Sequence, residues 1–308
     1  SASLVGSEMC IRDRYYSPMD WRFPGYFDPK GEEDPANADN ALLMKKQCYD
    51  QVRELVSNYG KIDILWYDGG WLAHKGSDTS SSWFWEPVKL NKMAREYNPK
   101  MIMNPRSGWE GNFYCDEGSH EITGKIIPVP WEKNMCVCSG CSWGWMADDP
   151  VSDFDWLIHM LVDVVTRDGN LLLNVGPDKN GHIRPDVAER MRQIGAWLRE
   201  NGDTIYKTRG GPIEPVDHVY GTTYRENEIF LHILDTEAFR NEVLPSIPYE
   251  ITSCTYKGEA LCFTQDEAQI QIQFPENLEK EADTIIRIRL KECVREKEQM
   301  EIHFTGKE

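Results

Sequence analysis

The sequence has few basic residues for its length. It contains 34 Lys and Arg against 51 Asp and Glu, which gives a formal net charge of −17. Binding to the phosphates of nucleic acid or to an anionic membrane surface needs clustered Lys and Arg side chains. We therefore expect no nucleic-acid partner, whereas a neutral ligand that is rich in hydroxyl groups is compatible with this charge.

The sequence also lacks long apolar runs and a leader. No run of 18 or more apolar residues occurs, so we expect no transmembrane span. SASLVGSEMCIRDR (1–14) has neither the basic start nor the apolar centre of a signal peptide, and it joins abruptly to YYSPMDW. We expect residues 1–14 to be a non-native tail and the native N-terminal part to be missing. Cellular compartment (periplasmic, secreted or cytoplasmic) and oligomeric state stay open.

The nine cysteines include only one closely spaced group, which is Cys136, Cys138 and Cys141. A structural zinc or iron–sulfur site needs a fourth ligand at suitable spacing, and the neighbouring residues offer none. We predict free thiols, no metal and no cofactor. A metal or redox module built on these three residues is the alternative, and a measured zinc content would decide between the two.

The pattern along the chain predicts two domains. Helices are expected at 40–60, 86–97, 155–169 and 185–202, and strands at 62–67, 101–104 and 170–177, whereas 15–21 is expected to be a strand end that opens into a loop. This alternation is typical of a parallel sheet with helical crossovers. After about residue 211 short alternating strands such as AQIQIQF predict an antiparallel β-sandwich over 212–308. The segment 105–150 has little periodicity and is too long for an idle connection, so we expect it to be functional or locally ordered.

One buried strand ends in a carboxylate among aromatic residues and glycines, in KIDILWYDGGW (61–71). In a (β/α) barrel the catalytic residues lie at the carboxyl ends of the strands, and Asp68 is in that position. Asn104 and Arg106 end the next strand, and Asp20 follows the first. An acidic pocket with aromatic walls suits glycoside hydrolysis, in which one carboxylate attacks the anomeric carbon and another protonates the leaving oxygen.

The residues by themselves leave other interpretations of this stretch open. Asp68 could be a turn or N-cap residue before the two glycines, and Trp66 could be an ordinary core residue. A binding protein could also keep an aromatic sugar site without hydrolysing its ligand.

Several segments resemble, in the same order, the α-L-fucosidases of glycoside hydrolase family 29. They are YYSPMDW (15–21), LWYDGGW (65–71), NPRSG (104–108), FYCDE (113–117), PWEKNMCVCSGCSWGW (130–145), GNLLLNVGPDKNGHI (169–183), GAWLRENGDTIYKT (195–208) and VYGTTYRENEIFLHIL (219–234). The resemblance covers nearly all of residues 15–235, and the conserved order of the segments makes it specific.

The resemblance implies an α/β fold with an incomplete (β/α)8-type TIM barrel over 15–211, followed by the β-sandwich. It implies a retaining exo-glycosidase that removes terminal α-L-fucosyl residues from a fucosylated oligosaccharide or glycoconjugate through a covalent glycosyl-enzyme intermediate. Asp68 matches the nucleophile and Glu117 the general acid/base, with Glu110 and Glu121 as fallback candidates. Because paired carboxyls in such a site need different proton affinities, we expect Asp68 to be ionised and Glu117 protonated.

The resemblance also implies residues that bind the substrate. Tyr16, Trp66 and Arg106 match positions that line the fucose site, and we assign Trp71 as a sugar-stacking wall. The chain departs from the family before residue 15, because the first barrel strands and the histidines that bind sugar hydroxyls are absent. The barrel part is also shorter than the roughly 250 residues of a typical barrel. The alternatives are therefore a retaining glycosidase of another specificity and an inactive sugar-binding fragment.

Overall fold

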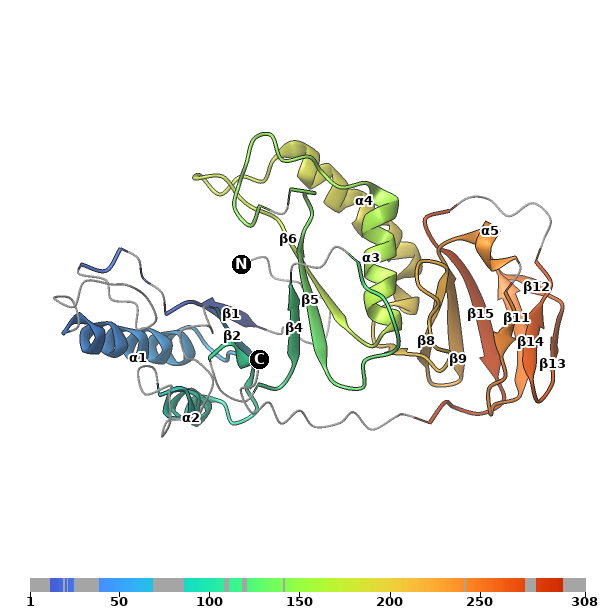
Figure 1. The fold of residues 1–308 in the computed structure, drawn as a ribbon, viewed down its shortest axis with the longest axis horizontal. Helices are drawn as coiled ribbons and strands as arrows, with labels where there is room; N and C mark the ends of the chain where they lie inside the picture. Colours follow the sequence, from blue (N-terminus) through green and yellow to red (C-terminus); the bar gives the residue numbers. More distant parts are fainter. Residues whose placement is uncertain are drawn as a thin grey trace. The chain divides into compact units, whose positions relative to one another are not determined.

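The computed structural model describes residues 12–18, 20, 22–24, 39–68, 86–107, 111–117, 121–140, 142–240, 242–274 and 281–295 (Figure 1). These residues divide into two compact units, the first ending at Cys115 and the second beginning at Asp116. Each unit is described by itself. Among the described helices, none combines the length and the apolar character that crossing a bilayer requires.

The first unit is built on a three-stranded sheet. Its elements are β1 (Asp13–Tyr16), α1 (Asn40–Asn58), β2 (Ile64–Tyr67), α2 (Pro87–Tyr97), β3 (Ile102–Met103) and the 3-10 helix η3 (Pro105–Ser107). Strands β1 and β3 both pair with β2 in parallel, and Tyr15 lies opposite Trp66. A helix connects each strand to the next, as parallel neighbours require. The alternation expected from the sequence is therefore confirmed here.

One face of this sheet packs on α1. Tyr16 and Tyr67 lie edge to face with ring centroids 6.5 Å apart, and they share a core with Cys48 and Val52 of α1. Because side chains alternate along a strand, the residue before Tyr16 points to the other face of the sheet. The face of the sheet that carries Tyr16 therefore serves apolar packing, and the opposite face has a different role.

Strand β1 begins inside the segment that was expected to be a tail. Asp13 pairs with Ile64 and Arg14 with Leu65 in the parallel ladder. The expected boundary at residue 14 therefore does not coincide with the start of the sheet, which takes in the last two residues of that segment. Residues 1–11 lie outside the described part of the chain.

The second unit begins with a small α/β layer. Its elements are β4 (Tyr114–Glu117), β5 (Trp131–Cys136), α3 (Phe154–Thr166), β6 (Asn170–Asn174), α4 (Pro185–Asn201) and the 3-10 helix η4 (Gly202–Thr204). The division between the units falls within β4, so that only Asp116 and Glu117 of this strand belong to the second unit. Strands β5 and β6 are parallel, and β4 lies on the other side of β5. Both β4 and β5 fall in the segment 105–150, which is therefore locally ordered in these two places. Lys133, Asn134 and Met135 are all buried, and a strand buried on both faces shows no alternation.

The remaining elements of this unit form antiparallel sheets. They are β7 (Arg209–Gly210), β8 (Tyr220–Arg225), β9 (Glu228–Ile233), α5 (Thr236–Phe239), β10 (Leu244–Pro245), β11 (Ile251–Tyr256), β12 (Glu259–Leu261), β13 (Phe263–Gln265), β14 (Gln269–Ile272) and β15 (Thr284–Leu290). A six-stranded sheet, β12-β11-β15-β9-β8-β7, and a three-stranded sheet, β10-β14-β13, share one apolar core that includes Leu231, Leu244, Ile270 and Ile286. The two sheets therefore form a sandwich, as the sequence predicted.

The α/β layer and the sandwich belong to the same compact unit. The boundary near residue 211 thus separates two kinds of sheet rather than two independent bodies. Among the described residues no closed barrel is formed, because the six strands before η4 fall into two three-stranded sheets.

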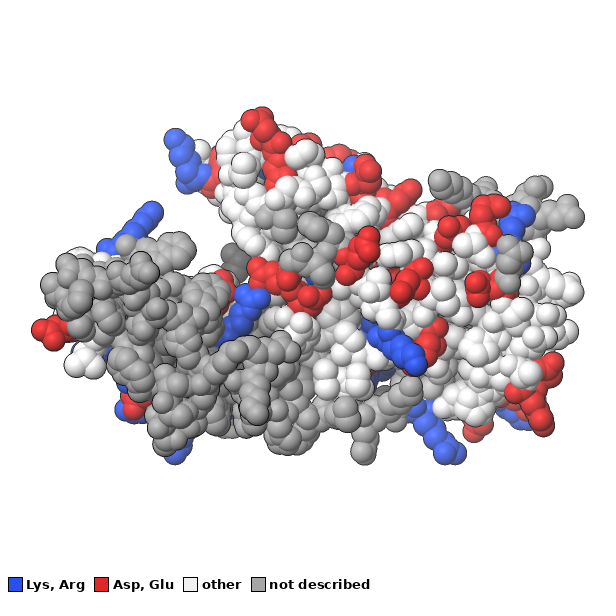
Figure 2. Space-filling view, in the orientation of Figure 1, with Lys and Arg blue, Asp and Glu red and all other residues white. Residues whose placement is uncertain are grey.

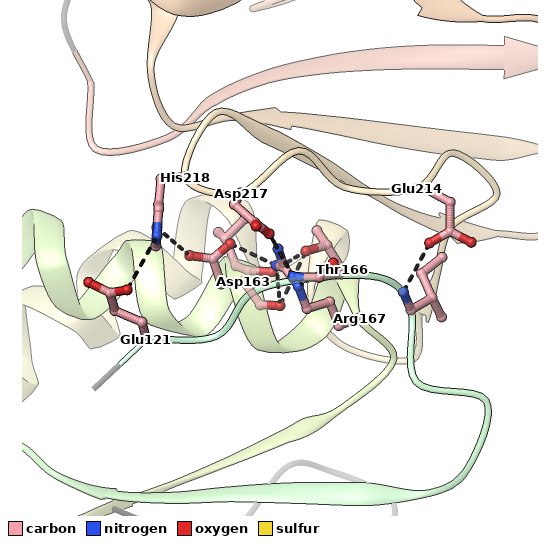
Figure 3. A network of polar contacts seen from close by, with 10 residues as sticks. Glu121, Asp163, Thr166, Arg167, Glu214, Asp217 and His218 are labelled. Atoms are coloured by element: carbon pink, nitrogen blue, oxygen red, sulfur yellow. Dashed lines mark hydrogen bonds and ion pairs between the residues drawn. The ribbon is translucent and has the colours of Figure 1, made fainter. Parts of the chain in front are cut away.

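A network of polar side chains fastens the end of α3 to the chain on either side of it (Figure 3). The fully buried Arg167 guanidinium donates to Asp163 Oδ1 over 2.8 Å and to Asp217 Oδ1 over 2.7 Å. His218 lies 3.7 Å from Asp163 and 4.0 Å from Glu121. Burial raises the pKa of Asp163, and the charge of Arg167 opposes this shift. Glu121 therefore takes part in a structural network of the second unit.

Figure 2 shows acidic side chains scattered over the described part of one face, and basic side chains do not gather into a patch there. The absence of a nucleic-acid partner stays a prediction.

Gly169 provides a test of packing between α3 and β6. A Cβ on this residue would lie 2.3 Å from Cε2 of Trp131, whose indole is held by a 2.9 Å hydrogen bond from Nε1 to the Arg167 carbonyl. We expect Gly169→Ala to lower the free energy of unfolding by about 1–3 kcal/mol, measured by urea unfolding. Gly195→Ala on α4 is the control, because its nearest contact would be 3.9 Å away, and helix propensity predicts equal or higher stability. Equal stabilities of the two variants would contradict the packing argument.

Candidate active site

Asp68 follows directly after β2, at the carboxyl end of the strand. Its backbone N–H donates to the Tyr16 carbonyl over 2.9 Å, which continues the pairing with β1 by one residue. Trp66 lies two residues earlier and so points to the same face of the sheet. The Asp68 side chain is 25% exposed, which leaves the carboxylate accessible from this face.

Each carboxylate oxygen of Asp68 accepts a hydrogen bond. The Tyr15 hydroxyl donates to Oδ2 over 2.5 Å, and Arg106 Nη1 donates to Oδ1 over 2.9 Å. The Arg106 guanidinium lies 4.8 Å from the centroid of the Trp66 ring, and the Tyr15 ring stacks on the same indole at 5.8 Å and 16°. Hydrogen bonds to an ionised group are strong and directional, so the plane of the carboxylate is fixed by two side chains, Tyr15 of β1 and Arg106 of η3.

Asn104 ties the ends of β2 and β3 together. Its Oδ1 accepts from the Tyr67 N–H over 2.9 Å, and its Nδ2 donates to the Tyr67 carbonyl over 2.8 Å, with the side chain fully buried. This pair of bonds fixes the backbone just before Asp68 and places η3, which carries Arg106, beside it. Sequence reasoning noted that Asn104 ends a strand but missed this role. An amide directly after a buried strand is the signal that was available.

The prediction for Tyr16 needs a correction by one residue. Tyr16 lies on the α1 face, where its hydroxyl donates to Gln51 Oε1 over 2.9 Å, and burial raises its pKa well above the usual range. Tyr15, on the opposite face, is the tyrosine that reaches Asp68. The parallel register, with Tyr15 opposite Trp66, determines which of the two adjacent tyrosines faces the carboxylate.

Asp13 is a second carboxyl on the same face of β1 as Tyr15, and sequence reasoning missed it. Burial raises its pKa to about 6, against the opposing effect of the Arg14 backbone. Its Oδ1 is buried without a hydrogen-bond partner among the described residues. This side chain is therefore protonated at a higher pH than an ordinary aspartate.

Glu117 is the last residue of β4 in the second unit, and it is exposed. The preceding residue, Asp116, accepts a 3.0 Å hydrogen bond from Lys133 Nζ of β5, and the Lys133 side chain is completely buried. Because adjacent residues of a strand point to opposite faces, this ion pair anchors β4 on one face and directs Glu117 to the other. Asp68 and Glu117 belong to different units.

The other predicted site residues differ in where they lie and in what they contact. Glu121 interacts with His218 in the network at the end of α3, which favours a structural role. Trp71 and Glu110 lie outside the described residues. Cys136 is buried at the end of β5. The pKa of the Cys138 thiol is raised, mainly by burial and further by the negative charge of the nearby Asp149.

Cys141 also lies outside the described residues. Within the described ranges, no group of three or more His, Cys, Asp and Glu side chains is arranged to hold a metal ion.

A small hollow lined by Cys136, Asn174 and Arg184 lies at the carboxyl ends of β5 and β6. Arg184 fixes the loop that borders it by donating to the carbonyls of Met146 over 2.7 Å and Asp149 over 2.5 Å. Trp143 and Trp145, carried by this loop, remain 44% and 45% exposed. The second unit thus presents two indole rings on a fixed loop at its strand ends. Sequence reasoning recognised them only as part of a motif.

The sequence also matches the model of a known protein family. The family model described as alpha-L-fucosidase matches residues 9–203, which is more than half of the chain. The chain belongs to the alpha-L-fucosidase family, glycoside hydrolase family 29. The match begins inside the segment that was expected to be a tail.

Individual members of the family agree with this assignment. Plasma alpha-L-fucosidase of Homo sapiens is 29% identical over 222 residues, 65% of this chain and 44% of that protein, so the chain spans less than half of its length. The alpha-fucosidase of Thermotoga maritima has a similar structure, with a TM-score of 0.65, 26% identity, and coverage of 89% of this chain and 63% of that one.

A third relative is similar in fold alone. It is a family 29 alpha-L-fucosidase of Bacteroides thetaiotaomicron, solved as a trapped covalent intermediate. Its TM-score is 0.73 at 19% identity, and the match covers 90% of this chain and 67% of that one.

Proposed function

We propose that the protein is a retaining α-L-fucosidase, which hydrolyses terminal α-L-fucosyl residues of fucosylated oligosaccharides or glycoconjugates. The observation that supports this most strongly is the carboxylate of Asp68, held by Tyr15 and Arg106 at a strand end of a family member. No specific observation favours the alternative of another sugar.

In the first half of the reaction, a carboxylate oxygen of Asp68 attacks the anomeric carbon and forms a glycosyl ester. The bond from that carbon to the leaving oxygen breaks, and Glu117 gives its proton to this oxygen. Arg106 and Tyr15 hold the carboxylate in one orientation, so that less conformational entropy is lost when the carboxylate oxygen reaches the anomeric carbon. The covalent intermediate trapped in the Bacteroides relative agrees with this step.

In the second half, the ionised Glu117 takes a proton from a water molecule. The water oxygen attacks the anomeric carbon, the ester bond to Asp68 breaks, and fucose leaves with its original anomeric configuration. Both carboxyl groups return to their starting protonation states, so the cycle balances without a cofactor.

We further propose that residues 15–211 belong to an incomplete (β/α)8-type barrel. Asp68 and Glu117 each lie at a strand end, which is where the catalytic residues of such barrels are found. Trp66 and the predicted Trp71 would form walls for the apolar face of the sugar. Trp143 and Trp145 supply further aromatic surface at strand ends of the second unit.

A panel of aryl glycosides tests the substrate assignment. The α-L-fucoside is expected to be cleaved, and the α-L-rhamnoside, β-D-galactoside and α-D-mannoside are not. Cleavage of another member of the panel at a higher kcat/KM than the fucoside would replace fucose by that sugar. The anomeric configuration of the first product, followed by NMR, separates a retaining from an inverting reaction.

The two tyrosines of β1 offer a matched pair for testing the corrected assignment. A hydrogen bond to a charged group is worth about 1.5–3 kcal/mol, so we expect Tyr15→Phe to lower kcat on the aryl fucoside roughly 10- to 100-fold. Tyr16→Phe removes a hydroxyl that contacts Gln51 and Cys48 and does not reach Asp68, and it should leave kcat within about threefold while lowering stability by about 1 kcal/mol. The opposite result would restore Tyr16 to the site.

A further inference from the structure

Helix α2 of the first unit carries a polar residue on its buried face. The buried residues of this helix are Pro87, Leu90, Asn91 and Ala94, and their spacing places them on one side of it. Leu90 and Ala94 belong to the apolar core of the unit, and Asn91 is only 1% exposed. Position 91 is therefore one at which the helical pattern predicts an apolar side chain.

Asn91 does not favour the stability of the helix. Asparagine is a poorer helix former than leucine or alanine, because its amide competes for backbone hydrogen bonds. The Asn91 Nδ2 donates to Ser107 Oγ over 3.1 Å, whereas its Oδ1 is buried without a hydrogen-bond partner among the described residues. Since an unpaired buried acceptor costs free energy, the contact with Ser107 is the one feature by which this side chain fits its position.

The contact with Ser107 attaches α2 to the segment that carries Arg106. Ser107 is buried, it is the last residue of η3, and it directly follows Arg106. Asn104 directly precedes η3, and its buried amide makes two hydrogen bonds with the backbone of Tyr67. The short helix η3 is thus attached at both ends, to β2 through Asn104 and to α2 through Asn91.

The backbone at the start of η3 is also confined by its neighbours. Pro105 restricts its own φ to about −65°. A Cβ on Gly111 would lie 2.5 Å from the Pro105 nitrogen and 2.8 Å from the Asn104 carbonyl carbon, so the chain folds back closely against this point. The Asn112 N–H donates to the Met103 carbonyl over 2.7 Å and holds the returning chain on β3. The end of η3 that Ser107 occupies depends on the contact with α2 instead.

We propose that Asn91 is a positioning residue for the hydrolysis. Through Ser107 it holds η3 in place, and η3 in turn holds the Arg106 guanidinium on the carboxylate of Asp68. That guanidinium lies 2.9 Å from Asp68 Oδ1 and 4.8 Å from the centroid of the Trp66 ring, and a displacement of η3 would disturb both contacts. The inference rests on the proposed fucosidase function, which assigns the attack on the sugar to this carboxylate.

A variant without the polar contact separates positioning from stability. In Asn91→Leu/Ser107→Ala both partners are replaced by apolar side chains, and the unpaired Oδ1 is removed as well. We expect urea unfolding of the full chain to show stability equal to or higher than that of the unsubstituted protein. We expect kcat on an aryl α-L-fucoside to fall about 10- to 100-fold, because small displacements of aligned groups have effects of this size.

Asn98→Ala is the matched control on the same helix. Asn98 directly follows α2, and its buried Nδ2 donates to the Ile62 carbonyl over 2.8 Å, before the start of β2 and at the opposite end of this strand from Asp68. Loss of this bond leaves a carbonyl unpaired, so stability should fall while kcat stays within about threefold. The double variant should therefore lose turnover and keep stability, and the control should do the reverse.

A second comparison tests whether the effect passes through Arg106. Arg106→Met removes the guanidinium, and adding Asn91→Leu/Ser107→Ala to it should change kcat less than about twofold, because the positioned group is already absent. Multiplication of the two separate effects would overturn the proposal, and so would an unchanged kcat in Asn91→Leu/Ser107→Ala. If this double variant does not fold, Ser107→Ala alone, which removes a single hydroxyl, is compared with Arg106→Met in the same way.

NMR of ¹⁵N-labelled arginine side chains tests the positioning without turnover. The Arg106 resonances are identified by their loss in Arg106→Met. We expect resolved Nη signals of Arg106 in the unsubstituted chain and in Asn98→Ala, and their loss in Asn91→Leu/Ser107→Ala. Unchanged signals in that variant would overturn the proposal whether or not the chain cleaves a fucoside. Loss of the signals in a chain that cleaves no fucoside would refute the proposed function and still support Asn91 as the residue that positions the guanidinium.

Discussion

Asp68→Ala is expected to abolish hydrolysis of an aryl α-L-fucoside, with kcat lower by roughly 10⁴-fold or more. The reason is that no glycosyl ester can form once the attacking carboxylate is gone. Release of the phenol is measured for the 308-residue chain and for a protein in which the preceding barrel strands of a family member are fused before Arg12. Each protein is compared with its own Asp68→Ala variant, so that the effect of the substitution is measured separately in the 308-residue chain and in the extended protein.

Asp63→Asn is the matched control for this experiment. Asp63 lies just before β2 and forms an ion pair with Lys61 at the surface, away from the hydrogen bonds of Asp68. We expect it to retain activity within about threefold. Substantial turnover by Asp68→Ala would remove this residue from the role of nucleophile. A well-folded extended protein that leaves the fucoside intact would instead refute the activity, and an inert chain beside an active extended protein would show that turnover requires the added strands.

The position of Asp68 could be predicted from sequence because its signals are local. A short apolar run fixes the strand, and the carboxylate directly after it lies at the strand end whatever surrounds the sheet. Arg106 could be placed beside it for the same reason, since it follows the next parallel strand. The structure brings the two within 2.9 Å, although 38 residues separate them.

The choice between Tyr15 and Tyr16 is not local. It depends on which tyrosine packs on α1, and the hydrogen bond to Gln51 and the contact with Cys48 that decide it involve residues more than 30 positions away. Two adjacent tyrosines show no hydrophobic alternation that would assign one of them to the core face. A register shift of one residue along the strand would exchange the faces to which the two side chains point.

The strand β5 escaped prediction for a different reason. Its consecutive residues Lys133 and Asn134 are both buried, and neither polar alternation nor a purely apolar run marks the segment. A buried lysine is tolerated there because Asp116 of β4 compensates its charge. That partner can be recognised only after the two strands have been paired, which is a long-range property.

The same limit applies to Asn91 and Ser107, which are 16 residues apart. In the sequence Asn91 is a single polar residue on the apolar side of a helix, and no pattern relates it to Ser107. Their contact appears only when α2 and η3 are assembled beside β2.

Glu117→Gln should separate the two chemical steps if Glu117 is the acid/base. General acid catalysis contributes roughly 10²–10⁴-fold, so kcat/KM on a fucosyl oligosaccharide should fall by about that factor. A dinitrophenyl fucoside needs little protonation of its leaving oxygen, and its kcat/KM should fall less than about tenfold. Azide should restore turnover of the aryl substrate and give a fucosyl azide of retained configuration, because azide attacks the ester without help from a base.

Glu110→Gln and Glu121→Gln are the controls, because these two residues are the fallback candidates. The Glu121 side chain is 73% exposed and lies 4.0 Å from His218, and such an exposed contact contributes little to stability, so Glu121→Gln should change neither stability nor turnover much. Azide rescue in Glu110→Gln and not in Glu117→Gln would transfer the acid/base role to Glu110. Glu117 is the first choice because the ion pair of Asp116 with Lys133 fixes the strand to which it belongs. A carboxyl group that must give and take a proton in each cycle has to return to the same place, and an anchored strand end provides that.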